Sequence, residues 1–217
     1  MGLTDIISRM TAAAVAAGRA PGVVTLIAVS KVQPHDRVRA VLEQGQRVFG
    51  ENYVQETQAK WPDWRLRFPD VRVHMIGPLQ SNKGRLAFDL FDAIHTLDRP
   101  SLVSKLARLA DQQGRCPDLF VQVNTGAEPQ KAGILPDDLS GFLRQVRDSG
   151  LAPRGLMCIP PDGQDPRPHF RMLRGLAHDH GLPDLSMGMS ADFETAIAEG
   201  ATHIRVGSAI FGARDYT

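Results

Sequence analysis

Short apolar segments alternate with longer amphipathic segments along most of the chain. The apolar segments are rich in Val, Ile and Leu and predict buried strands at Val24–Ser30, Arg47–Gly50, Val71–Gly77, Asp92–Thr96, Leu119–Asn124, Arg154–Ile159, Asp184–Gly188 and His203–Gly207. The amphipathic segments predict helices at Arg37–Gln44, Ser101–Gln113, Pro136–Ser149, His169–His180 and Ala191–Glu199. A glycine directly follows each of these helices, as is typical of helix C-termini.

This alternation predicts a parallel α/β fold. Strands that alternate with helices form a parallel sheet with right-handed crossovers. A count of eight strands favours a closed (β/α)₈ TIM-type barrel over an open doubly wound sheet. No linker and no shift in composition interrupts the pattern, so we expect one domain over residues 1–217.

A further helix is predicted before the first strand. Within Met1–Ala20, Thr4 is the expected N-cap, and Ile6, Ile7 and Met10 are expected on one apolar face. The segment has neither the basic leader nor the long apolar region of a signal peptide. We therefore expect an extra N-terminal helix in a cytoplasmic protein.

The composition narrows the class of function. Apolar residues make up 42% of the chain and charged residues 23%, and the formal net charge is +1. These values are ordinary for a globular protein and give no field that would recruit nucleic acid or an acidic membrane. No apolar stretch reaches membrane-spanning length. Cys116 and Cys158 are isolated, the seven histidines lack paired spacing, and no metal site is expected.

Lys31 is the most informative residue, because it ends the first predicted strand. In a barrel of this type, the carboxyl ends of the strands surround the active-site mouth. A lysine in a partly desolvated mouth more readily loses its proton, and its free amine can condense with an aldehyde. The chain contains only five lysines, so there are few candidates for such a Schiff base.

A second group of candidate residues follows the seventh and eighth predicted strands. In barrels, the loops after these strands commonly form a phosphate site. Ser190 offers a hydroxyl there, and Gly207 and Ser208 offer backbone amides that can approach an anion closely. A phosphate site opposite an aldehyde-reactive lysine predicts a site for pyridoxal 5′-phosphate (PLP).

Arg205 then has a specific expected role. It precedes Gly207 by two residues on the same strand, so it lies on the same face and can reach the pyridine nitrogen of PLP. A guanidinium remains charged and has no proton to give to that nitrogen. An unprotonated ring is a weak electron sink, which suits racemisation or simple carriage of the cofactor better than transamination.

Six sequence runs together resemble one family. They are Ala28–Lys31, Phe49–Glu56, His74–Lys83, Arg154–Met157, Ser186–Asp192 and Arg205–Gly212. In this order, from about Val24 to Tyr216, they resemble the pyridoxal phosphate homeostasis protein family, called YggS in bacteria and PROSC in animals.

The resemblance implies a barrel like the N-terminal domain of alanine racemase, with PLP held as an aldimine on Lys31. It also implies a role in vitamin B6 homeostasis and no established catalytic activity. The implied PLP-binding residues are Lys31, Asn52, Ser186, Ser190, Arg205, Gly207 and Ser208. Among these, Ser186 is a nearby candidate for the phosphate loops, and Asn52 lies at the mouth end of the second strand. Lys131 matches a family lysine after the fifth strand, although a solvated loop charge is an equal alternative.

Two alternatives remain open at this point. A PLP-dependent racemase needs an acid or base on each face of the substrate carbon, and Lys31 supplies only one. In alanine racemases the other comes from a partner's additional domain, which we do not expect here, and Tyr53 and Tyr216 are the only tyrosines. A Schiff-base aldolase would leave Arg205 without a role. The favoured hypothesis is a monomeric PLP carrier whose possible partners are PLP-dependent apo-enzymes, not nucleic acid or membranes.

Two smaller features complete the sequence-based expectations. His74 and His95 fall on neighbouring predicted strands, and we interpret them as core residues. Trp61 and Trp64 flank Pro62, and we interpret them as a packing or loop feature after the second strand.

Overall fold

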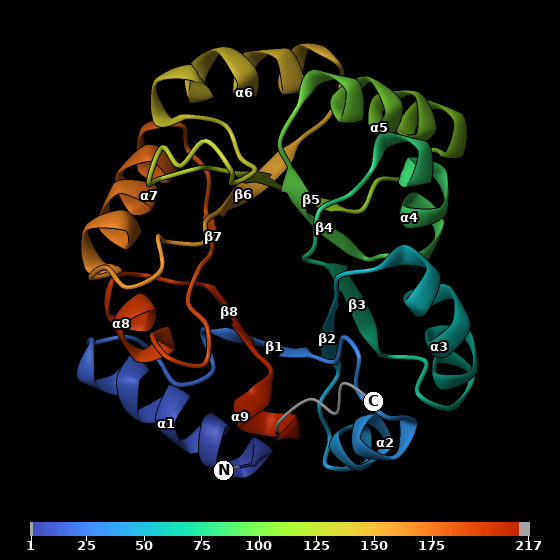
Figure 1. Ribbon diagram of the computed structural model, residues 1–217, viewed down its shortest axis with the longest axis vertical. Helices are drawn as coiled ribbons and strands as arrows, with labels where there is room; N and C mark the ends of the chain where they lie inside the picture. The colour runs from blue at the N-terminus through green and yellow to red at the C-terminus, as the bar shows by residue number, and fades with distance from the viewer. Residues whose placement is uncertain (1, 213–217) are drawn as a thin grey trace.

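Eight parallel strands close into a barrel in the computed structural model, which describes residues 2–212 (Figure 1). The strands are β1 (Thr25–Val29), β2 (Val48–Glu51), β3 (Arg72–Met75), β4 (Ala93–Leu97), β5 (Asp118–Gln122), β6 (Pro153–Met157), β7 (Asp184–Ser186) and β8 (His203–Val206). Each strand pairs with the next along the chain, and β1 pairs with β8. The predicted barrel is confirmed, and every strand overlaps its predicted range. Tyr216 lies outside the described residues.

Helices form a ring around the barrel (Figure 1). They are α1 (Leu3–Ala16), α2 (His35–Glu43), α3 (Val54–Arg67), α4 (Gly84–Leu90), α5 (Pro100–Gln113), α6 (Leu139–Asp148), α7 (Arg167–Asp179), α8 (Phe193–Ala198) and α9 (Ser208–Phe211), with short 3₁₀ turns η1 (Ser81–Lys83) and η2 (Pro136–Asp138). The five predicted inter-strand helices are all present. Each ends one or two residues before a glycine with positive φ, at Gly45, Gly114, Gly150, Gly181 and Gly200. Within residues 2–212, no helix has both the length and the apolar character needed to cross a bilayer.

The N-terminal helix begins earlier than predicted. Its N-cap is Gly2, whose N–H donates to the Asp5 carboxylate at 3.1 Å, so the assignment of Thr4 as N-cap is wrong. The buried stripe runs through Leu3, Ile6, Met10 and Ala14, toward α8 and α9 (Figure 1). Ile7 is exposed, so it does not belong to the buried face with Ile6 and Met10 as expected.

The segment after β2 is a helix with Trp61 and Trp64 buried, so their interpretation as a packing feature is confirmed and the loop alternative is wrong. Helix α3 continues through Pro62. Its buried residues recur at the three- and four-residue spacing of one helix face, at Val54, Thr57, Trp61 and Trp64. This spacing was present in the sequence and outweighs the loss of one backbone hydrogen bond at proline. Two side chains of α3, Glu56 and Lys60, bond to the backbone just after β1.

The interior of the barrel contains an unusual ring-stacked layer. His74, His95 and Phe120 are buried, and His95 stacks on Phe120 with ring centroids 4.1 Å apart. His203 and Phe120 form an edge-to-face pair with ring centroids 5.2 Å apart. Inward-facing positions of TIM-type barrels are dominated by branched apolar residues. Because both side chains are buried, the interpretation of His74 and His95 as core residues is confirmed. Their buried ring nitrogens need hydrogen-bond partners.

Candidate functional site

A pocket of about 170 Å³ lies where the carboxyl ends of β1, β2, β7 and β8 meet. Its lining residues are Val29, Lys31, Asn52, Ile76, Ile159, Met189, Ser190, Arg205, Gly207 and Ser208. Six of the seven residues predicted to bind a cofactor are therefore brought together, although they lie far apart in the sequence. The pocket has an amine, an amide, two hydroxyls and a guanidinium in its wall.

Asn52 reaches this pocket because a glycine lies beside it. A Cβ atom at Gly77 would lie only 2.6 Å from the Cα atom of Asn52, closer than real atoms approach. Gly77 follows β3, so only glycine lets the backbone after β2 and the backbone after β3 pack this closely.

Arg205 forms a buried wall of the pocket, with 5% of its surface exposed. One terminal nitrogen donates to the Ser186 hydroxyl at 2.7 Å, and the other donates to the Cys158 carbonyl at 2.9 Å. Burial lowers the pKa of the guanidinium from its usual value. A guanidinium has more N–H groups than these two bonds use, so donors remain for an acceptor in the pocket.

Ser186 lies apart from the other predicted site residues. It is fully buried and does not line the pocket, which corrects its assignment to the phosphate loops. Its hydroxyl lies 2.7 Å from Arg205 and 2.8 Å from Nδ1 of His95. Ser186 ends β7 with its side chain inside the barrel, so it supports Arg205 from behind.

The hydrogen bonds continue from Ser186 into the barrel core. Nε2 of His95 lies 3.0 Å from Nδ1 of His74. When Ser186 accepts from Arg205, its own proton is free to donate to His95, and His95 in turn donates to His74. Among the described residues, Nε2 of His74 has no hydrogen-bond partner. Sequence analysis placed both histidines in the core but missed this connection to Arg205.

The core histidines are neutral at physiological pH. Burial lowers the pKa of His74 to about 3 and that of His203 to about 4. Burial also lowers the pKa of His95 well below its usual value. The desolvation of an imidazolium is the main cause in each case. Arg205 is therefore the charged member of the network that reaches the pocket.

Residues of both predicted phosphate loops line the same pocket as Lys31. Ser190 lies in a turn before α8, which begins at Phe193 with Asp192 as N-cap instead of at Ala191. Gly207 and Ser208 lie where β8 ends and α9 begins. The first amides of a helix have no acceptors within that helix, so this strand-to-helix junction has donors available for an anion.

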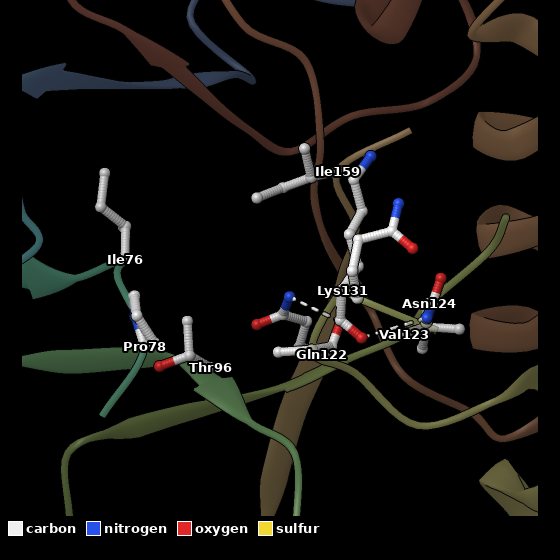
Figure 2. A pocket seen from close by; sticks show the side chains of 10 residues that line it. Ile76, Pro78, Thr96, Gln122, Val123, Asn124, Lys131 and Ile159 are labelled. Atoms are coloured by element: carbon white, nitrogen blue, oxygen red, sulfur yellow. Dashed lines mark hydrogen bonds between the residues drawn. The ribbon is translucent and has the colours of Figure 1, made fainter. Parts of the chain in front are cut away.

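A second cavity of about 360 Å³ adjoins the first, and the two share Ile76 and Ile159. Figure 2 shows Ile76 and Pro78 on one side of this cavity and Lys131 and Ile159 on the other. The Lys131 ammonium is 2.6 Å from the Glu128 carboxylate and 3.1 Å from the Pro160 carbonyl. With 29% of its side chain exposed, Lys131 is not a fully solvated loop charge, but it does not line the pocket of Lys31.

Comparisons with known proteins agree with this fold. The family model described as "Alanine racemase, N-terminal domain" matches residues 11–215. A pyridoxal phosphate homeostasis protein of Pseudomonas aeruginosa is 43% identical, over 99% of this chain and 95% of the relative. The structure of PipY from Synechococcus elongatus without PLP has a TM-score of 0.84 and 41% identity, over 95% of this chain and 100% of that chain. The structure of PipY with PLP bound has a TM-score of 0.80 and 39% identity, with the same coverage.

Proposed function

The chain belongs to the pyridoxal phosphate homeostasis protein family, whose fold is that of the alanine racemase N-terminal domain, and from this premise we propose that it binds PLP through Lys31. It takes part in intracellular vitamin B6 homeostasis by holding the cofactor. The observation that supports this most strongly is the convergence of Lys31, Arg205 and the loops after β7 and β8 on one pocket.

The chemistry of the donors fits PLP. The aldehyde of PLP forms a Schiff base with a lysine amine, and Lys31 supplies this amine. Ser190, Gly207 and Ser208 bind the phosphate through hydroxyl and amide donors. Arg205 donates to the pyridine nitrogen, and Asn52 lines the wall near Lys31. Ser186 acts through Arg205 and has no direct contact in this proposal.

Arg205 favours a role in carrying PLP, because it does not turn the pyridine ring into a strong electron sink. Its guanidinium keeps its proton, so the pyridine nitrogen is not protonated by it. Racemisation also needs a second acid or base opposite Lys31. Tyr53, with 54% of its surface exposed, lies outside the lining of the Lys31 pocket. We therefore propose a carrier, acting as a single domain and a monomer in the cytoplasm, with PLP-dependent apo-enzymes as recipients.

Equilibrium dialysis against PLP and against pyridoxal tests the phosphate part of the proposal. Charged hydrogen bonds to the phosphate make PLP bind about 10- to 100-fold more tightly than pyridoxal. The double variant Ser190→Ala/Ser208→Ala loses part of this preference, because it removes both hydroxyl donors and keeps the backbone amides. Equal affinity for PLP and pyridoxal in the parent protein would contradict the assignment of the phosphate loops.

Carriage is separated from catalysis by two assays of the PLP-loaded protein. The loaded protein reactivates a PLP-dependent apo-enzyme, and the optical rotation of free amino acids stays constant over the same period. Racemisation at ordinary enzymatic rates, on the order of 10 per second, would contradict the carrier proposal.

A further inference from the structure

Lys31 lies in a strained turn of the backbone. The turn runs from Ser30 to Gln33, and the Gln33 N–H donates to the Ser30 carbonyl at 3.2 Å. Its third residue, Val32, has a φ of 55°, in the left-handed region. Turns with a positive φ at this position require glycine or asparagine, and a β-branched residue there is a genuine outlier. Val32 is also 43% exposed, so burial of its side chain does not explain the conformation.

Two side chains of α3 hold this turn on both sides of Lys31. One carboxylate oxygen of Glu56 accepts the Val32 N–H at 2.7 Å. The ammonium of Lys60 donates to the Ser30 carbonyl at 2.8 Å. Glu56 and Lys60 also pair with each other at 2.9 Å, one helical turn apart. We call these two residues the α3 clamp.

The α3 clamp is anchored in the core. Lys60 is 4% exposed and pairs with the fully buried Glu51 at 2.8 Å. The same oxygen of Glu51 accepts from the Ser30 hydroxyl at 2.7 Å and from the Trp61 indole at 3.0 Å. Buried, multiply bonded ion pairs fix geometry far better than exposed pairs, which contribute little. The clamp therefore ties the end of β1 to a rigid element.

From this geometry we infer that Glu56 and Lys60 are positioning residues that keep Val32 left-handed and thereby aim the Lys31 amine into the pocket. The inference rests on the proposed function, since it assigns a purpose to the orientation of Lys31. Neither residue lines the pocket, so both act through the backbone of the turn. Strained backbone of this kind persists only where the surrounding structure enforces it.

Thermal unfolding of the PLP-free protein tests the strain. Alanine and glycine at position 32 both remove the valine side chain, but only glycine adopts a positive φ without cost. Val32→Gly melts roughly 2–4 °C above Val32→Ala. At an ordinary backbone position the order is reversed. A Val32→Ala variant that melts at or above Val32→Gly would overturn the inference.

A double-mutant cycle tests whether Glu56 acts on Val32. Glu56→Ala lowers the melting temperature, and the decrease is smaller in the Val32→Gly background, because glycine needs no clamp to stay left-handed. Glu56→Gln keeps an acceptor for the Val32 N–H, so its melting temperature falls less than that of Glu56→Ala. Glu43→Ala, which removes an exposed glutamate of α2, is the matched control and shows no coupling to position 32. Equal effects of Glu56→Ala in both backgrounds would overturn the inference.

Covalent trapping connects the clamp to Lys31. At limiting PLP, borohydride reduction labels Lys31 about tenfold less in Glu56→Ala than in the parent, and Val32→Gly restores part of the loss. Unchanged labelling in Glu56→Ala would show that the clamp does not aim Lys31. A parent protein with no label on Lys31 would instead defeat the proposed function, and the melting cycle would still decide whether the clamp holds the turn.

Discussion

At the scale of single residues, Arg205 depends on Ser186 for one of the two hydrogen bonds that its guanidinium makes within residues 2–212. The Ser186 hydroxyl bridges Arg205 and His95 in a fully buried position. Leaving a buried donor or acceptor without a partner costs far more free energy than losing the same hydrogen bond at the surface. Ser186 therefore links the stability of the barrel core to the orientation of the pocket arginine.

Replacing Ser186 by alanine tests this link. Ser186→Ala leaves a guanidinium N–H and an imidazole nitrogen buried without a partner, and we expect a loss of about 1–3 kcal/mol in the free energy of unfolding. Urea denaturation at pH 7.5 measures it. Ser140→Ala is the control, because its hydroxyl makes an exposed bond to His180 at 3.2 Å. The expectation is wrong if the two variants lose the same stability.

Sequence reasoning found most of the candidate site because all strand ends of a barrel meet at one mouth. Lys31, Arg205 and Gly207 follow directly from that rule. It misplaced Ser186, since adjacency to a loop does not tell which way a strand residue points. It could not find the α3 clamp, because the clamp depends on the backbone angle of Val32 and on a helix that was not predicted.

At the scale of secondary-structure elements, glycine has opposite effects at helix ends and in helix interiors. Gly114 closes α5 with a φ of 63°, and Gly175 lies exposed inside α7. A Cβ at either position would meet no atom within 4 Å. Only the backbone preference of each position therefore distinguishes the two glycines.

Alanine at these two positions should shift stability in opposite directions. Gly114→Ala destabilises the protein by about 1 kcal/mol, because alanine disfavours positive φ. Gly175→Ala stabilises it by about 0.5–1 kcal/mol, because glycine in a helix interior is entropically unfavourable. Urea unfolding curves of the two variants measure both changes. Shifts of the same sign would contradict this account of the helix ends.

Most of the strands and longer helices could be predicted from the sequence. Parallel strands buried on both faces appear as continuous apolar runs, and the glycine after each of five helices marks where it ends. Helix α3 is not predicted by the sequence, because a proline inside a helical pattern usually ends the helix, whereas here α3 continues through Pro62. Helices α4 and α9 were not predicted either.

At the scale of the whole molecule, three histidines in the barrel interior couple folding to pH. Burial lowers the pKa of His74 to about 3 and that of His203 to about 4, and it also lowers the pKa of His95 well below its usual value. In the unfolded chain these groups take up protons near pH 6.5. Stability is therefore fully present above pH 6.5 and is lost as the pH falls toward the folded-state pKa values. Glu51, whose pKa burial raises, has the opposite effect and offsets part of the loss.

A single histidine variant isolates this dependence. His74→Gln removes one of these groups, so the decline in unfolding free energy between pH 6 and pH 4 becomes shallower by about 1.4 kcal/mol per pH unit. Urea titrations at several pH values give the slope. His178→Gln, at an exposed position on α7, leaves the slope unchanged. An unchanged slope in His74→Gln would show that His74 titrates normally in the folded protein.

The central claim is that Lys31 binds PLP covalently. The most direct measurement is borohydride reduction of the PLP-loaded protein, followed by peptide mapping of all five lysines. The account predicts that the phosphopyridoxyl label lies on Lys31 and is lost in Lys31→Arg, which keeps the charge but cannot form the Schiff base. A label on Lys131 or another lysine, or no label at saturating PLP, would contradict it.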